Sequence, residues 1–206
     1  MRSTAHKLVA TARRLHERGL VHGRTGNISA RVQQGFLITP SGSALADVSA
    51  DELSLVSLEN VHLDGLPPSK ESFLHAAMLR ARPQDRSVLH THSLHSTAVS
   101  CLADIDREDA VPALTAYFAM RLGRVVALPY HAPGDIRLGP LAEHAARNAH
   151  ALLLRRHGPV ISAASLSEGL DAIEELEQTC ALYFLLRGYD APALSTNERE
   201  ALAHHL

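Results

Sequence analysis

Apolar residues recur every three to four positions in several stretches of the chain, and this spacing predicts amphipathic helices. The first runs from Ser3 to Gly19, with Leu8, Ala12 and Leu15 on one side. A later helix is predicted to end at Gly188, since glycine is common just past the end of a helix. The segments 70–80, 95–104, 139–149 and 166–188 show the same spacing.

Other stretches alternate between apolar and polar residues, which predicts strands. "NISARVQQGFLITP" indicates a hairpin that turns at 33–35, and "DELSLVSLENVHLDGLPPS" indicates a second pair of strands that turns near Asp64 and Gly65. "SVLHTHS" and "RVVALPY" are further strands, and "HALLLRRHGPVIS" contains a strand followed by a His-Gly turn. Strands and helices mix without a regular βαβ repeat, so we expect a three-layer α/β (α+β) fold. We expect one domain over 1–206, with 189–206 as a peripheral tail.

Composition excludes several classes of protein. The chain has 206 residues with 20 basic and 22 acidic side chains, so it has no strong field for nucleic acid or an anionic membrane. The charged N-terminus and the lack of an 18-residue apolar run argue against a signal peptide or a membrane span. Cys101 and Cys180 stand far apart, which fits a reducing cytoplasm. The chain has 14 histidines, of which His204 and His205 are expected to be tail residues without a chemical role.

Three histidines follow one apolar run, in "SVLHTHSLHSTAVS". On an extended strand, His90 and His92 project from the same face and can reach one ion. Zn²⁺ is the favoured metal, although other divalent ions also accept imidazole ligands. The third ligand stays open between His95, which stands where a helix should begin, and His157, which follows another apolar strand. The alternative is that these are hydrogen-bonded structural histidines.

Five motifs occur in one order: "RTGNISAR", "LITPSG", "PPSKESFLH", "VLHTHSLHSTAVS" and "LLLRRHGPVIS". Together they resemble the class II aldolase/adducin family over almost the whole chain, from about Ala5 to Gly188. The resemblance implies a class II aldolase-like domain with a mainly antiparallel central sheet flanked by helices. It implies that His90, His92 and His157 hold a catalytic Zn²⁺ and that Glu71 is the acid/base. His95 is then left beside the ligands.

The resemblance also implies a site for the substrate phosphate. Glycine lets the backbone approach an anion, serine donates a hydrogen bond, and a helix N-terminus near 69–70 offers free N–H groups. Without the family context, "TGN" and "TPSG" are typical of ordinary turns. Lys70 stands where the aldolases commonly have a second serine. The implied phosphate-binding residues are Gly26, Asn27, Ser41, Gly42, Ser69 and Lys70.

Within the family, "HTHSLHSTAVSCL", "LTAYFAMRLGRVVALPYHAPGDIRLG" and "EELEQTCALYFLLRG" resemble the 3-oxo-tetronate 4-phosphate decarboxylase branch. This implies decarboxylation of 3-dehydrotetronate 4-phosphate to dihydroxyacetone phosphate and CO2, through an enediolate that the metal stabilises. A cytoplasmic homotetramer is also implied. No role is assigned to Tyr117, Arg121, Tyr130 and His131.

Two alternatives stay open. The first is a class II sugar-phosphate aldolase similar to L-fuculose-1-phosphate aldolase, which would release an aldehyde instead of CO2. The second is a non-enzymatic interaction module of the adducin type. Retention of Glu71 with the three histidines argues against the second alternative.

Overall fold

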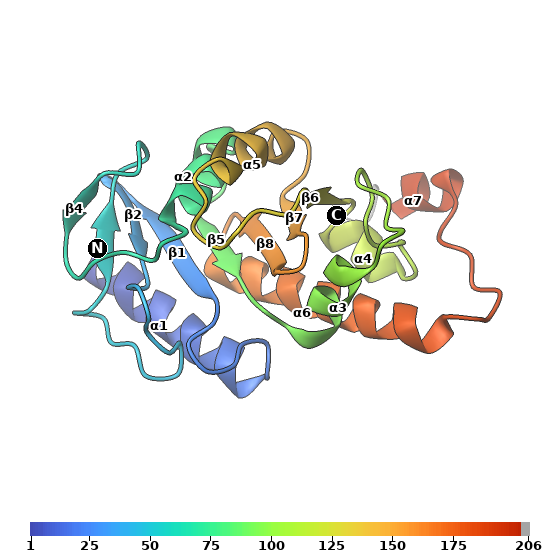
Figure 1. The fold of residues 1–206 in the computed structure, drawn as a ribbon, viewed down its shortest axis with the longest axis horizontal. Coiled ribbons are helices and arrows are strands. Elements are labelled where there is room, and N and C mark those ends of the chain that lie inside the picture. The colour runs from blue at the N-terminus through green and yellow to red at the C-terminus, as the bar shows by residue number, and fades with distance from the viewer. Residues whose placement is uncertain (203–206) are drawn as a thin grey trace.

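The fold is built on one eight-stranded sheet, seen in a computed structural model that describes residues 1–202 (Figure 1). The tail histidines His204 and His205 lie outside the described residues. The strand order is β4-β3-β2-β1-β5-β8-β7-β6, and every neighbouring pair is antiparallel except β6 and β7. The expected mainly antiparallel sheet is therefore confirmed. The strands are β1 Asn27–Val32, β2 Gly35–Ile38, β3 Ser54–Val56, β4 His62–Asp64, β5 Ser87–His90, β6 Val125–Leu128, β7 Ala151–Leu154 and β8 Gly158–Ala163.

Helices cover both faces of this sheet, as the three-layer prediction requires. Figure 1 shows α2 and α5 above the sheet and α1 and α6 below it. None of the helices between residues 1 and 202 combines the length and the apolar character needed to cross a bilayer. The helices are α1 Arg2–Glu17, α2 Ser72–Ala81, α3 Leu94–Cys101, α4 Ala116–Arg121, α5 Leu138–Ala146, α6 Leu166–Leu186 and α7 Thr196–Leu202.

Strand alternation divides the core into two clusters, one on each face of the sheet. On β5, Leu89 packs with the α1 and α6 side, whereas Val88 packs with the α2 and α5 side. On β1, Ile28 belongs to the α1 side, so its neighbours Asn27 and Ser29 project toward α2. The period of two therefore brings polar side chains of β1 to the face on which α2 begins.

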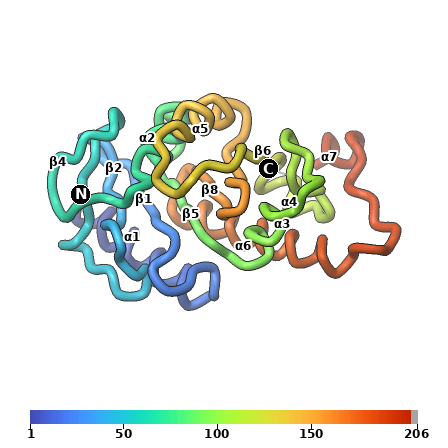
Figure 2. Tube along the Cα trace, in the orientation of Figure 1, coloured from blue at the N-terminus to red at the C-terminus, as the bar shows by residue number. Residues whose placement is uncertain are grey.

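Several local predictions were wrong or incomplete. The turn between β3 and β4 lies at 57–61, where the Ser57 N–H donates to the Val61 carbonyl and Asn60 takes a φ of 63°. Gly65 instead follows the end of β4. We did not predict α4, α7 or the separate strand β8. In Figure 2 the chain runs from α1 and the β1–β4 strands at one end to α7 at the other, and α7 buries none of its residues.

Candidate active site

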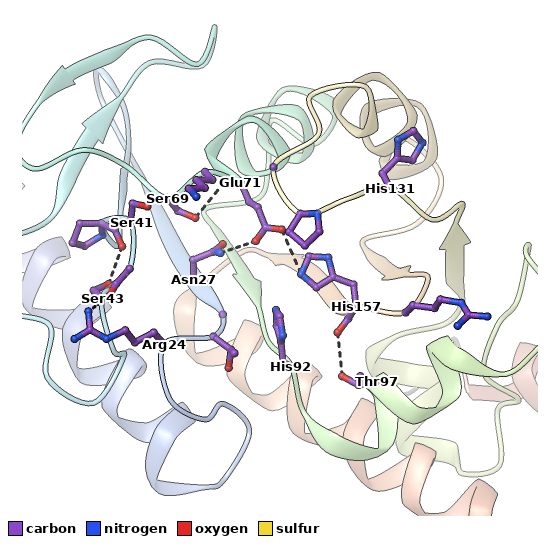
Figure 3. Close-up of a pocket in the computed structure, with 18 of the residues that line it drawn as sticks. Arg24, Asn27, Ser41, Ser43, Ser69, Glu71, His92, Thr97, His131 and His157 are labelled. Atoms are coloured by element: carbon purple, nitrogen blue, oxygen red, sulfur yellow. Dashed lines mark hydrogen bonds and ion pairs between the residues drawn. The ribbon is translucent and has the colours of Figure 1, made fainter.

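A cavity of about 620 Å³ opens between the start of β1, the start of α2 and the β7–β8 turn (Figure 3). Histidines lie at one side of it, whereas serine and glycine loops lie at the other. All the predicted site residues except His90 line this cavity, and His90 lies directly behind its wall in contact with His92 and His157. The further lining residues are Arg24, Thr25, Pro40, Ser43, Thr97, Tyr130, His131, Pro133, Gly134 and Arg156.

The side chains of His90, His92 and His157 meet at one point. The Nε2 atom of His90 lies 3.1 Å from that of His92 and 3.3 Å from that of His157. The three ring centroids are 4.7–4.9 Å apart, each pair edge to face. The structure therefore brings together two neighbouring histidines and a third that is 65 or more positions away in the chain.

The sheet topology places these rings, although not in the way the sequence predicted. β5 ends at His90, so His92 does not continue the strand but lies in the segment before α3. That segment is held against β8, where the Thr91 N–H donates to the Pro159 carbonyl at 3.2 Å. A side chain at Gly158 would place its Cβ 2.3 Å from the Thr91 carbonyl oxygen, so only glycine allows this close approach. The pairing of β5 with β8 thus brings His157 to the other two rings.

The histidines are oriented as metal ligands. The Nδ1 atom of His90 lies 2.9 Å from the Pro159 carbonyl, which can only accept, so Nδ1 donates to this carbonyl and Nε2 faces the cluster. Burial and the neighbouring ring of His90 lower the pKa of His92 to about 3 and that of His157 to about 4. Three imidazole nitrogens facing one centre, with all ligand atoms within 4.8 Å, fit a divalent cation.

Glu71 faces this cluster from the start of α2. Its carboxylate oxygens lie 3.4 Å from His90 Nε2 and 3.5 Å from His157 Nε2, and Asn27 Nδ2 donates to it at 3.0 Å. Burial raises the pKa of Glu71, but His90, His157 and the Asn27 hydrogen bond outweigh burial and leave the pKa below its ordinary value. The helix predicted over 70–80 would place Glu71 in its first turn, whereas Glu71 is the N-cap residue immediately before α2.

The loops predicted to bind phosphate face the cavity from the other side. Gly42 has a φ of 71° and lies beside exposed Ser41. The expected helix N-terminus is displaced because α2 begins only at Ser72, and the Ser69 N–H already donates to the Thr39 carbonyl at 3.3 Å. Exposed Lys70 remains as a cation at the cavity wall.

Gly26 and Asn27 also have structural roles that do not involve phosphate. A Cβ at Gly26 would lie 2.8 Å from the His90 carbonyl oxygen, so this glycine lets the loop before β1 approach β5. The Asn27 side chain points to Glu71 in Figure 3 rather than to the serine loops. Its amide therefore hydrogen-bonds the carboxylate, and phosphate binding by Asn27 stays a prediction.

Arg24 was not predicted as a site residue, although its Nη1 donates to the Gly42 carbonyl at 2.7 Å across the cavity rim. Its place in "RTGNISAR", three positions before Asn27, was the available signal. Tyr130 and His131 line the cavity, whereas Tyr117 and Arg121 line a separate hollow on the α4 and α6 side. His95 turns to Glu177 on α6 instead of joining the other three rings.

Comparison with known proteins agrees with this geometry. The sequence model of the family described as "Class II Aldolase and Adducin N-terminal domain" matches residues 6–184, most of the chain. The chain belongs to this family. The resemblance seen in the five sequence motifs is thereby confirmed.

The chain is similar to several members of the class II aldolase and adducin family. It is 36% identical to the 3-oxo-tetronate 4-phosphate decarboxylase of Haemophilus influenzae over 93% of this chain and 91% of that protein. It is 41% identical to the protein of the same name from Pectobacterium atrosepticum, over 82% and 78%. The crystal structure of YgbL from Escherichia coli, a putative aldolase/epimerase/decarboxylase, superposes with a TM-score of 0.94 at 35% identity, covering 98% of both chains. The L-fuculose phosphate aldolase of Escherichia coli is 29% identical over 95% and 89%.

Proposed function

We propose that the protein is a metal-dependent carbon–carbon lyase that decarboxylates 3-oxo-tetronate 4-phosphate to dihydroxyacetone phosphate and CO2. The observation that carries this proposal is the position of Glu71, within 3.5 Å of two histidines of a three-histidine cluster and in the same cavity as the serine and glycine loops. One side of the cavity suits the reacting carbons, and the other suits the phosphate.

The reaction breaks the bond between the carboxylate carbon and carbon 2 of the substrate. The electron pair left on carbon 2 moves into the carbonyl at carbon 3, CO2 leaves, and a proton is added to carbon 2. A divalent cation, when bound, supplies positive charge that polarises this carbonyl. His90, His92 and His157 are the residues that would hold it.

Glu71 moves the proton in this proposal. Its lowered pKa makes it a carboxylate at rest, so it first takes up a proton from solvent and then delivers that proton to carbon 2, which returns Glu71 to the carboxylate. The Asn27 hydrogen bond keeps that carboxylate turned toward the histidines. Ser41, Gly42, Ser69 and Lys70 hold the phosphate at the opposite side of the cavity, so that carbon 2 stays within reach of Glu71.

The relatives support decarboxylation over aldol cleavage, because the proteins named decarboxylase are 34–41% identical to the chain whereas those named aldolase are 29–32% identical. The aldolase alternative uses the same residues on a substrate with a hydroxyl-bearing carbon in place of the carboxylate. Zn²⁺ is the proposed metal because three neutral imidazoles are a common zinc ligand set. A homotetramer is the proposed assembly, on the family resemblance.

Product analysis separates these functions. Zinc-loaded protein is incubated with 3-oxo-tetronate 4-phosphate and, separately, with L-fuculose 1-phosphate, while CO2 and aldehyde are measured in each reaction. We expect CO2 from the first substrate and little aldehyde from the second. Aldehyde without CO2 would identify an aldolase, and neither product would favour a binding module of the adducin type.

A further inference from the structure

A hydrogen-bonded chain of buried residues leads from α2 through β1 to Glu71. His75 on α2 has no solvent exposure, and its Nδ1 lies 2.7 Å from Ser29 Oγ. Its Nε2 lies 2.5 Å from Asn27 Oδ1, and Asn27 Nδ2 lies 3.0 Å from Glu71 Oε2. Asn27 and Ser29 stand two positions apart on β1, so both project to the face on which α2 packs.

Donor and acceptor chemistry allows only one direction of donation along this series of hydrogen bonds. An ionised Glu71 can only accept, so Asn27 must turn its NH2 group to the carboxylate. The Asn27 carbonyl oxygen then faces His75, which must donate from Nε2. Burial lowers the pKa of His75 to about 3, so its ring is neutral and Nδ1 is left to accept from the Ser29 hydroxyl.

We propose that His75 is a positioning residue that fixes the amide of Asn27 so that it donates to Glu71 and holds the carboxylate toward the histidine cluster. Among the described residues, Asn27 is the side chain that donates a hydrogen bond to this carboxylate. A reversed amide would place its carbonyl oxygen against the carboxylate and release Glu71. This inference rests on the proposed function in that Glu71 is taken as the proton-transfer group.

Two amide variants of His75 provide a matched test. In His75→Gln the side-chain amide reaches the place of Nε2 and retains a donor to Asn27, whereas in His75→Asn the shorter amide reaches only the place of Nδ1 beside Ser29. We expect His75→Asn to lower kcat by at least about tenfold with little change in KM or in bound metal, and His75→Gln to stay within about threefold of the parent. Equal kcat for the two variants, or a loss found only in KM or metal content, would overturn the proposal.

The tautomer of His75 gives a readout that needs neither turnover nor a substitution at His75. In protein labelled with ¹⁵N-histidine, NMR should show a neutral ring with the proton on Nε2 and a bare Nδ1, assigned by the shift that Ser29→Ala causes. A proton on Nδ1 instead of Nε2 would reverse the direction of the hydrogen bonds and refute the inference, even if His75→Asn failed to fold.

A partial reaction separates this inference from the choice of substrate. Decarboxylation and aldol cleavage both yield dihydroxyacetone phosphate, and both add a proton to its hydroxymethyl carbon. The rate at which hydrogen on this carbon exchanges with solvent deuterium therefore measures proton transfer by Glu71 in either case. We expect exchange to fall in His75→Asn and to persist in His75→Gln. Absence of CO2 from the unaltered protein would reject only the decarboxylase, whereas equal exchange in both variants would reject only the role of His75.

Discussion

Glu177 on α6 binds the first turn of α3 through His95: one carboxylate oxygen lies 2.7 Å from the His95 backbone nitrogen and 2.8 Å from its Nδ1. The second oxygen accepts from the backbone N–H of Ser96 at 3.0 Å and from its hydroxyl at 2.9 Å. The carboxylate is buried, and it satisfies N–H groups that a helix N-terminus leaves without partners. Glu177 therefore fixes the start of α3, directly after the segment that carries His92.

We predict that Glu177→Gln destabilises the protein by about 1.5–3 kcal/mol, the range for hydrogen bonds to a charged group. The amide has one acceptor oxygen where the carboxylate has two, and its NH2 group faces donors. The change in the free energy of unfolding is measured by urea titration. Glu174→Gln on the same helix is the control, because Glu174 makes a surface ion pair with Arg18, which should be worth less than about 1 kcal/mol. Equal losses in the two variants would contradict the capping role.

Metal binding can be tested with two histidines three positions apart. His92→Ala removes a ring nitrogen that lies 3.1 Å from His90 Nε2, so the variant should lose bound metal and turnover. His95→Ala removes a ring that faces Glu177, so it should keep its metal while losing some stability. Elemental analysis of the purified variants measures the metal. Unchanged metal in His92→Ala would refute its assignment as a ligand.

Acid should destabilise the metal-free protein before carboxylates titrate. The pKa values of His75 and His92 are lowered to about 3 and that of His157 to about 4, mainly by burial. Below about pH 6.5 these histidines therefore gain protons in the unfolded chain first, so stability falls by up to about 1.4 kcal/mol per pH unit for each of them. Urea unfolding of EDTA-treated protein between pH 7 and 5 measures this slope. His92→Ala should flatten it, and the same slope in that variant would exclude His92 as a source.

Local sequence patterns predicted the elements whose signals lie within a few residues. The β1–β2 hairpin and α6 formed where alternation and helical spacing placed them. The turn between β3 and β4 was predicted at the wrong place. The Asp64-Gly65 pair suggested a turn there, but the left-handed residue of the actual turn is Asn60. Pro159 in β8 obscured that strand, since proline is uncommon inside a sheet.

The candidate site could be predicted only in part, because most of its contacts join residues that are distant in sequence. The spacing of His90 and His92 predicted that both reach one ion from the same face of a strand. The strand argument was wrong, because β5 ends at His90 and a short irregular segment carries His92 to the cluster. The approach of His157 depends on β5 pairing with β8, which no local pattern specifies. The family resemblance favoured His157 over His95 and supplied the role of Glu71, whereas the link from Asn27 to His75 appeared only in the structure.

Lys70 offers a test of the proposed phosphate site, because the only other lysine of the sequence is Lys7 on α1. Lys70 is exposed at the cavity wall beside Ser69 and Gly134, where its ammonium group can pair with a bound phosphate. Lys70→Met should raise KM for the phosphorylated substrate by about tenfold or more, as expected for loss of one charge-assisted hydrogen bond. Because the group binds the phosphate equally before and during the reaction, kcat should change little. Inhibition by inorganic phosphate should weaken in parallel, and Lys7→Met should leave both constants as they are. An unchanged KM in Lys70→Met would mean that the ammonium group points to solvent and that the serine and glycine loops hold the phosphate without it.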